Sequence, residues 1–251
     1  MTWRFLDTGL HSGTFNMEFD ETLAQQLNAG DCPPTLRVYG WHPAAISIGR
    51  NQNMADFDQA KLSSEGIDLV RRPTGGRAIL HADELTYCAV LPVQGRSLRE
   101  IYRLLNEGIL SALLMLGIDA KLSSDEPSFR QLYADSASIP CFSSTAKCEI
   151  QFEGKKLVGS AQRRLGTTVL QHGSLLLGPG HRCILDFLAP HVDRARTAME
   201  EHLLECTTDV QAILGRTVSF GEAAMCMKKG FETACGITFT ESEVSLEEIE
   251  H

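Results

Sequence analysis

Three segments of the sequence carry residue types that could act together on one ligand. The first, Arg71 to His81, is a glycine-rich turn between arginines; the second is a polar loop around Cys141; the third is a basic strand, Lys155 to Arg164. A thiol is a strong nucleophile only as the thiolate, and a nearby ammonium lowers its pKa by favouring that charged form. Lys156 is the best candidate for this ammonium.

The basic segment KKLVGSAQRR is predicted to form a strand. Alternation gives it two faces, one with Lys156, Val158, Ser160 and Gln162 and the other with Leu157, Gly159 and Ala161. A glycine weakens a strand unless something must approach the backbone closely, so Gly159 indicates a ligand nearby. On this segment alone, a solvated basic edge strand is the alternative.

The turn Pro73-Thr74-Gly75-Gly76 lies between two predicted strands. It is therefore neither a Rossmann nor a P-loop motif, because both need a helix to follow the glycines. Consecutive glycines still let backbone N–H groups converge on an anion, while Arg71, Arg72 and Arg77 supply positive charge. The turn is thus a candidate anion-binding loop.

Two histidines lie within or beside these segments. His81 ends the strand after the turn, and His172 lies in an apolar strand before Gly173. Each could line a site or could be a hydrogen-bonded core residue. The eight cysteines form no CxxC and no zinc-like pairing with histidine, so the sequence predicts no metal site and mostly buried, structural thiols.

Strands and helices of several lengths surround these segments. Helices are expected at Phe15 to Asn28, Asp58 to Glu65, Ser97 to Leu116, Arg182 to Leu188, Asp209 to Leu214 and Phe220 to Cys235. Leu36 to Trp41 and Ala45 to Ile48 are expected to form a hairpin, and Lys147 to Phe152, Lys156 to Arg164 and Thr168 to Leu177 an antiparallel meander. Ser123 to Thr145, which contains Cys141, is predicted to be a long loop. The consistent class is α+β with a mostly antiparallel or mixed sheet.

Length and charge restrict the class of protein. A chain of 251 residues can form one domain with a substantial core, and a helical part is expected from about residue 180. The net charge of -9 argues against non-specific binding to nucleic acid or to an anionic membrane. Since no apolar run of membrane-spanning length and no leader is evident, a cytoplasmic location is expected.

The motifs resemble those of one known family, the lipoate-protein ligase and octanoyltransferase superfamily. The similarity rests on RRPTGGRAILH, Glu84-Leu85-Thr86-Tyr87, Pro140-Cys141-Phe142, GKKLVGSAQRR and LQHGSLLL, and it is closest to the single-domain LipM-type octanoyltransferases. It implies the fold of biotin protein ligases and class II aminoacyl-tRNA synthetase cores, a central mixed sheet flanked by helices. It also implies a single catalytic domain over residues 1–251.

The resemblance further implies a division of labour among the residues. Cys141 would take an octanoyl or lipoyl group from acyl carrier protein as a thioester, and Lys156 would lower the pKa of that thiol. The acyl pocket would be lined by Arg72, Gly75, Gly76, His81, Gly159, Ser160, Ala161 and His172. The acceptor would be a lysine of a lipoyl domain, as in 2-oxoacid dehydrogenase acyltransferase subunits or the glycine cleavage H protein. Such a transferase needs no cofactor.

Two positions depart from the pattern of the ATP-dependent ligases in this superfamily. Arg77 stands where those ligases have a third glycine, and Ala82 follows His81 where they have an aspartate. The alternative is nevertheless a lipoate-protein ligase that uses ATP and Mg²⁺, forms lipoyl-AMP and depends on Lys156. A non-catalytic lipoate-binding module is the third reading. The sequence leaves open octanoyl against lipoyl, the acceptor protein and the oligomeric state.

Overall fold

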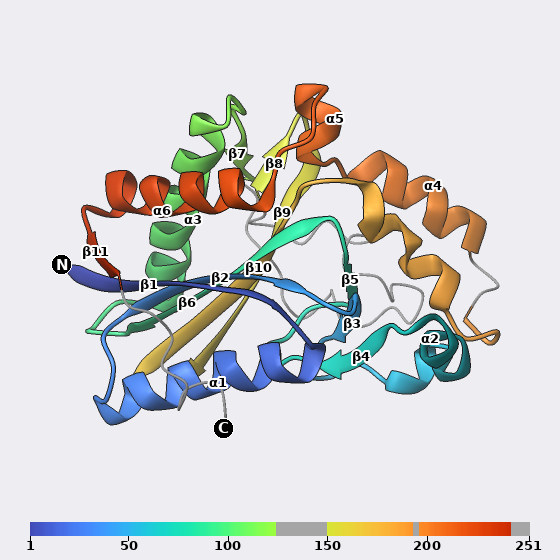
Figure 1. The fold of residues 1–251 in the computed structure, drawn as a ribbon, viewed down its shortest axis with the longest axis horizontal. Coiled ribbons are helices and arrows are strands. Elements are labelled where there is room, and N and C mark those ends of the chain that lie inside the picture. The colour runs from blue at the N-terminus through green and yellow to red at the C-terminus, as the bar shows by residue number, and fades with distance from the viewer. Residues whose placement is uncertain (124–149, 193–195, 242–251) are drawn as a thin grey trace.

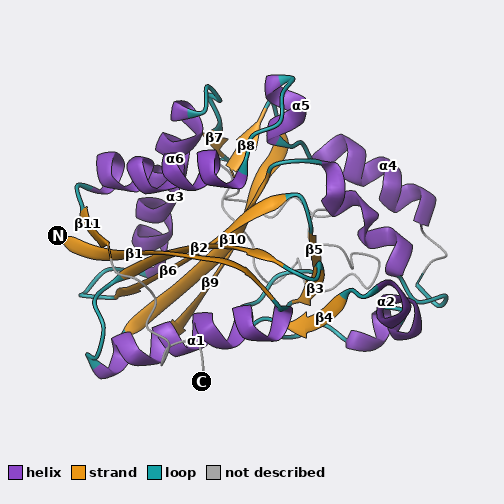
Figure 2. Ribbon diagram, in the orientation of Figure 1, coloured by secondary structure: helices purple, strands orange, loops and turns teal. Residues whose placement is uncertain are grey.

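The structure is a computed structural model that describes residues 1–123, 150–192 and 196–241. Within these residues the chain forms a mixed sheet of eight strands in the order β11-β1-β2-β6-β10-β9-β8-β7 (Figures 1 and 2). These strands are β1 (Thr2–His11), β2 (Thr35–Trp41), β6 (Glu84–Pro92), β7 (Lys121–Leu122), β8 (Ile150–Phe152), β9 (Lys155–Leu165), β10 (Thr168–Leu176) and β11 (Thr238–Glu241).

The sheet changes from parallel to antiparallel pairing at β2. β1 runs parallel to β2 and β11, whereas the pairs from β2 to β7 are antiparallel. Parallel neighbours need a crossover connection, and helix α1 (Gly13–Ala29) supplies it between β1 and β2. Ser12 caps the first turn of α1, and Gly30 ends the helix in the left-handed conformation.

Helices cover both faces of this sheet (Figure 1). On one face, α3 (Leu98–Met115) and α6 (Phe220–Cys235) share a core with Leu85, Tyr87 and Ala89 of β6. On the other face, α1 packs on β6 and β10, and its apolar residues share a core with Cys88 and Val90. The alternation of β6 between the two cores is the pattern of a strand buried on both sides.

A second sheet of three strands lies beside the α1 face. It consists of β4 (Asp68–Arg71), β3 (Ala45–Ile48) and β5 (Ile79–His81), in that order. Its own core is shared with segments of the C-terminal half. The remaining elements are η1 (Met54–Asp56), α2 (Gln59–Glu65), η3 (Pro179–Phe187), α4 (Arg196–Cys206) and α5 (Val210–Leu214). None of the described helices is both long and apolar enough to cross a membrane.

Most predicted elements are confirmed, and the α+β class with a mixed sheet and flanking helices is correct. The predicted hairpin of Leu36 to Trp41 with Ala45 to Ile48 is wrong, because these strands belong to different sheets. Arg182 to Leu188 is part of a 3₁₀ helix, and α4, β7 and β11 were not expected from the sequence. Residues 124–149, which include the predicted loop with Cys141 and the start of one predicted strand, lie outside the described residues.

Helices α3 and α6 approach so closely that only glycine fits at their crossing. A Cβ added to Gly230 would lie 2.4 Å from the Ala112 amide nitrogen and 2.6 Å from the Gly108 carbonyl oxygen. These are backbone atoms, so relief requires the helices to separate. We expect Gly230→Ala to lower the free energy of unfolding by about 1–3 kcal/mol, the usual cost of overpacking.

The matched control is Gly221→Ala in the first turns of the same helix, where nothing lies within 4 Å of an added Cβ. There alanine should be neutral or stabilise by up to about 1 kcal/mol, because glycine loses more conformational freedom on folding. Urea unfolding of both variants measures the difference. Equal effects would contradict the close crossing.

Candidate functional site

Lys156 is buried near the start of β9, with 4% of its surface exposed. Ile150 of β8 pairs with Val158 whereas Gln151 pairs with Lys156, so Leu157 is an extra residue in β9. Leu157 and Val158 both belong to the core under α3 and α6. A β-bulge of this kind turns two consecutive side chains to one side. Lys156 therefore faces the α1 side of the sheet together with Gly159 and Ala161, and the predicted grouping of Lys156 with Val158 is wrong.

Strand pairing places the other candidate residues of β9 and β10. Ala161 lies opposite His172, and Gly159 lies opposite Ser174, so these four residues share the α1 side of the sheet. Ser160 faces the other side, where its hydroxyl is 2.7 Å from the Tyr87 hydroxyl. Only the backbone of Ser160 is thus left to line a site with Gly159 and Ala161.

Arg72 holds the glycine-rich turn in place. Its Nε and Nη2 donate to the Gly75 carbonyl at 3.1 and 2.9 Å, Nη2 also donates to the Arg77 carbonyl at 2.6 Å, and Nη1 donates to the Ser47 carbonyl at 3.0 Å. Arg72 as a whole is only 6% exposed, so its guanidinium is buried. The turn is therefore built around a buried positive charge that binds its carbonyl groups. Direct contact of Arg72 with a ligand stays a prediction.

The turn also packs directly against the end of β3. A Cβ on Gly49 would lie 2.0 Å from the Gly76 carbonyl oxygen, and Gly76 itself has φ of +93°. Both positions therefore require glycine, the first for close approach and the second for its left-handed backbone. This constraint places Gly75 and Gly76 at a defined position beside the smaller sheet.

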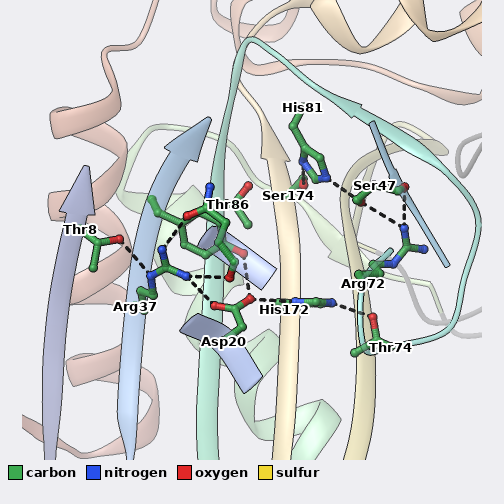
Figure 3. Close-up of polar contacts among 12 residues, drawn as sticks. Thr8, Asp20, Arg37, Ser47, Arg72, Thr74, His81, Thr86, His172 and Ser174 are labelled. Atoms are coloured by element: carbon green, nitrogen blue, oxygen red, sulfur yellow. Dashed lines mark hydrogen bonds and ion pairs between the residues drawn. The ribbon is translucent and has the colours of Figure 1, made fainter. Parts of the chain in front are cut away.

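His172 ties the turn to a buried ionic network (Figure 3). Its Nδ1 is 2.9 Å from Asp20 Oδ2, and its Nε2 is 2.6 Å from the Thr74 hydroxyl. Asp20 also accepts from Arg37 Nη1 at 2.7 Å and from the Tyr39 hydroxyl at 2.8 Å. The Asp20 and Arg37 side chains are both 0% exposed. A chain of hydrogen bonds thus runs from the middle of the sheet to the turn.

The ionisation of this network is set by burial and by the partners. Burial alone would raise the pKa of Asp20, but the hydrogen bond from His172 and the charge of Arg37 outweigh it, so the pKa lies below its ordinary value. Burial lowers the pKa of His172, against the opposing effect of Asp20. His172 is therefore neutral near pH 7, with Nδ1–H donated to the carboxylate and Nε2 accepting from Thr74.

His81 forms a second buried cluster next to the first (Figure 3). Its Nε2 is 2.7 Å from the Ser47 hydroxyl, its Nδ1 is 2.7 Å from Glu84 Oε1, and its ring stacks on Trp41 at a centroid distance of 3.9 Å. The hydroxyl groups of Ser174 and Thr86 donate to the same Glu84 oxygen. Since Ser47 Oγ also accepts from Arg72 at 3.2 Å, this cluster too ends at the turn.

Both ring nitrogens of each histidine are engaged. A histidine in this state cannot take a proton from a substrate without breaking one of its hydrogen bonds. His81 and His172 therefore act as supports of the site in this structure. Their contacts are those of hydrogen-bonded core residues rather than of exposed bases. Their contact with an acyl group stays a prediction.

The acidic residues and the arginine that organise these clusters had no predicted role. Asp20, Arg37 and Glu84 are buried, and each binds one of the two histidines or its partner. One signal was present in the sequence: Arg37 stands in an apolar strand, and Asp20 lies on the helix stripe that also carries Asn16. A buried charge needs a partner, so an arginine and an aspartate that are both at buried positions are expected to pair with each other.

Most of the described cysteines are buried or half-buried, whereas Cys183 is exposed. Burial raises the pKa of Cys88, Cys206, Cys226 and Cys235, that of Cys235 to about 11. Cys141 lies outside the described residues, so its approach to Lys156 stays a prediction. Among the described residues, no group of three or more histidine, cysteine, aspartate or glutamate side chains could hold a metal ion.

Breaking the buried ion pair should cost far more than removing an exposed charge. Asp20→Ala leaves Arg37 buried without its carboxylate, so we expect a loss of about 3–5 kcal/mol in the free energy of unfolding. The control Asp31→Ala, at an exposed position after the same helix, should change it by about 0.5 kcal/mol or less. Similar midpoints for the two variants in urea would contradict this role of Asp20.

The bond between Thr74 and His172 can be tested with an isosteric change. Thr74→Val leaves the buried His172 nitrogen without a donor, which should cost about 1–3 kcal/mol and speed hydrogen exchange at the Gly75 and Gly76 amides. Thr168→Val is the control, because the Thr168 hydroxyl is buried and has no hydrogen-bond partner among the described residues. If Thr168→Val sped hydrogen exchange in the turn as much as Thr74→Val, the support of the turn by the bond between Thr74 and His172 would be wrong.

Comparison with known proteins identifies relatives along almost the whole chain. The model of the lipoyl protein ligase A/B catalytic domain matches residues 12–232. The octanoyltransferase LipM of Kyrpidia tusciae is 39% identical, over 99% of this chain and 93% of the relative. The octanoyltransferase LipM of Bacillus subtilis is 35% identical, over 99% and 92%.

A solved structure confirms the fold. The bipartite lipoate protein ligase of Thermoplasma acidophilum, solved in a study of that enzyme and its E2 lipoyl domain, matches with a TM-score of 0.80 and 22% identity, over 99% of this chain and 89% of that chain. At this identity the match bears on the fold alone. Taken with the family match and the close relatives, it shows that the chain belongs to the lipoyl protein ligase A/B catalytic domain family.

Proposed function

We propose that this protein is an octanoyltransferase that moves an octanoyl group from acyl carrier protein to a lysine of a lipoyl domain, in a single catalytic domain. The observation that carries the proposal is near-complete alignment, at 39% and 35% identity, with two proteins named octanoyltransferase LipM. The burial of Lys156 and the presence of a supported glycine-rich turn both fit this activity. Lipoyl domains are the proposed acceptor class, which is supported by the solved lipoate protein ligase that was studied with its E2 lipoyl domain.

The proposed reaction has two acyl transfers at one thiol. The Cys141 thiolate attacks the octanoyl carbonyl, the bond to the carrier's sulfur breaks, and the carrier leaves as a thiol after gaining a proton. The neutral amine of the acceptor lysine then attacks the new thioester, an amide bond forms, and the Cys141 thiol is released. Both steps start from a thioester, which is already activated for attack, so neither needs ATP or a metal.

Lys156 has the role of a fixed positive charge in this scheme. An ammonium near Cys141 favours the thiolate before attack and stabilises the oxyanion of each tetrahedral intermediate. Because Lys156 is almost fully buried, water screens its charge little. The turn containing Gly75 and Gly76 and the backbone of Gly159 to Ala161 would then line the acyl group.

An ATP-dependent lipoate-protein ligase is the second candidate, since the fold match includes such a ligase. In that enzyme Lys156 would bind the acyl-adenylate, and Cys141 would be incidental. Arg77 in place of a third glycine favours the transferase. Its carbonyl accepts from Arg72, so this residue is part of the fixed turn.

Trapping the acyl-enzyme distinguishes the two candidates. Incubated with octanoyl acyl carrier protein and no ATP, the protein should gain one octanoyl group that hydroxylamine removes, as seen by intact mass. Cys141→Ala should abolish the adduct, and Cys148→Ala, in the same stretch of the chain, should retain it. An adduct that survives Cys141→Ala, or no adduct at all, would overturn the thioester mechanism.

The role of Lys156 is measured in the same assay. Lys156→Ala removes the charge that stabilises the thiolate and the oxyanion, so the rate of adduct formation should fall by about 10²–10³-fold. Lys121→Ala is the control, because Lys121 is exposed on β7, at the edge of the same sheet. Full activity of Lys156→Ala would show that the site is wrongly placed. Formation of a bound lipoyl-adenylate from lipoate and ATP would favour the ligase.

A further inference from the structure

The residues that directly follow helix α4 pair with Lys156 in the position that a neighbouring strand would take. The pairing of β10 with β9 ends at Leu175 opposite Val158, whereas β10 stays paired with β6 as far as Leu176. Thr207 pairs with Lys156 in a parallel bridge, and the Thr208 amide donates to the Lys156 carbonyl at 3.0 Å. The backbone of Lys156 is therefore held on both sides, by Gln151 of β8 and by this segment.

The Thr207 side chain fixes the segment in this position. Thr207 is 1% exposed, and its hydroxyl donates to the Leu203 carbonyl at 2.6 Å. The same oxygen lies 3.1 Å from Nε2 of His181, which is 2% exposed and comes from η3. One hydroxyl thus joins α4 to η3 at the residue whose backbone pairs with Lys156.

Two neighbouring contacts support the same attachment. The Gln211 amide donates to the Leu177 carbonyl at 3.1 Å, which binds the start of α5 to the chain leaving β10. Lys155 Nζ donates to the Leu204 carbonyl at 3.2 Å. Burial lowers the pKa of His181 to about 4, so its ring is neutral near pH 7 and adds no positive charge beside Lys156.

We propose that Thr207 is a positioning residue for Lys156: it holds the backbone of the lysine so that the ammonium reaches the reacting acyl group. Lysine has four rotatable side-chain bonds, so its charge is precisely placed only if the backbone is fixed and the side chain enclosed. A displacement of about 1 Å in such a group can cost 10²-fold in rate. This inference rests on the proposed role of Lys156 in acyl transfer.

The test compares Thr207→Val with Thr207→Ser in the full-length protein. Valine keeps the shape but removes both hydrogen bonds, whereas serine keeps the hydroxyl. We expect Thr207→Val to lower kcat for octanoyl transfer about tenfold or more, with KM for the carrier protein within about twofold, and Thr207→Ser to restore most of the rate. The control is Thr168→Val, which removes a buried hydroxyl that has no hydrogen-bond partner in the part of the chain that the structure describes.

A second readout does not depend on activity. Lysines can be acylated with a small anhydride and the extent at Lys156 measured by peptide mass spectrometry. If Thr207 encloses and fixes Lys156, its labelling rate should rise several-fold in Thr207→Val and stay unchanged in Thr207→Ser and Thr168→Val. An unchanged rate of labelling in Thr207→Val would overturn the proposal, as would an equal loss of activity in the valine and serine variants.

The two readouts separate this proposal from the proposed function. If Lys156→Ala kept full transferase activity, the function of Lys156 would be refuted, while labelling would still report whether Thr207 fixes it. If Lys156→Ala lost activity but Thr207→Val changed neither rate nor labelling, only the positioning role would fail. Thermal unfolding of each variant distinguishes a loss of position from a loss of fold.

Discussion

The site depends on the interactions of one buried carboxylate, that of Asp20. It lies between a guanidinium, a phenol and an imidazole, all of them buried, and it is ionised because Arg37 and His172 favour the charge more than burial opposes it. One consequence is structural, since the carboxylate joins α1 to β2 and β10. The other concerns the site, since it sets the tautomer of His172 and leaves the distal ring nitrogen to accept from Thr74.

A second buried carboxylate, on β6, binds another histidine in the same way. Glu84 orients His81, which reaches Ser47 and through it Arg72. The glycine-rich turn is thus supported from two directions by buried histidines, while its own carbonyl groups surround the Arg72 guanidinium. Groups held in this way need little rearrangement when charge develops in a bound substrate, which is the condition for electrostatic catalysis. In β9, the bulge at Leu157 turns Lys156 toward the α1 side of the sheet.

Much of the fold was predictable because local signals agree with it. The capping box of Ser97 and Glu100 gives the start of α3, and the meander of β8, β9 and β10 follows from short turns with glycine. The hairpin expected at Trp41 failed because β2 and β3 find partners far away in the sequence. Helix α4 was missed because only Met199 and Leu203 are buried in it, which gives a weak periodic pattern.

Candidate site residues could be chosen from the sequence, but their geometry could not, and their contact with an acyl group stays a prediction. Lys156, the glycine-rich turn and the two histidines could be chosen from the sequence, whereas a bulge that moves Lys156 to the other face depends on the partner strand. The central claim is that an acyl group passes through a thioester on this protein without ATP. The most direct measurement is to isolate the octanoylated protein free of carrier, add a lipoyl domain without ATP, and follow both masses. We predict loss of the octanoyl group from the protein matched by gain on the lipoyl domain; an acyl group that stays on the protein, or moves only when ATP is added, would contradict the claim.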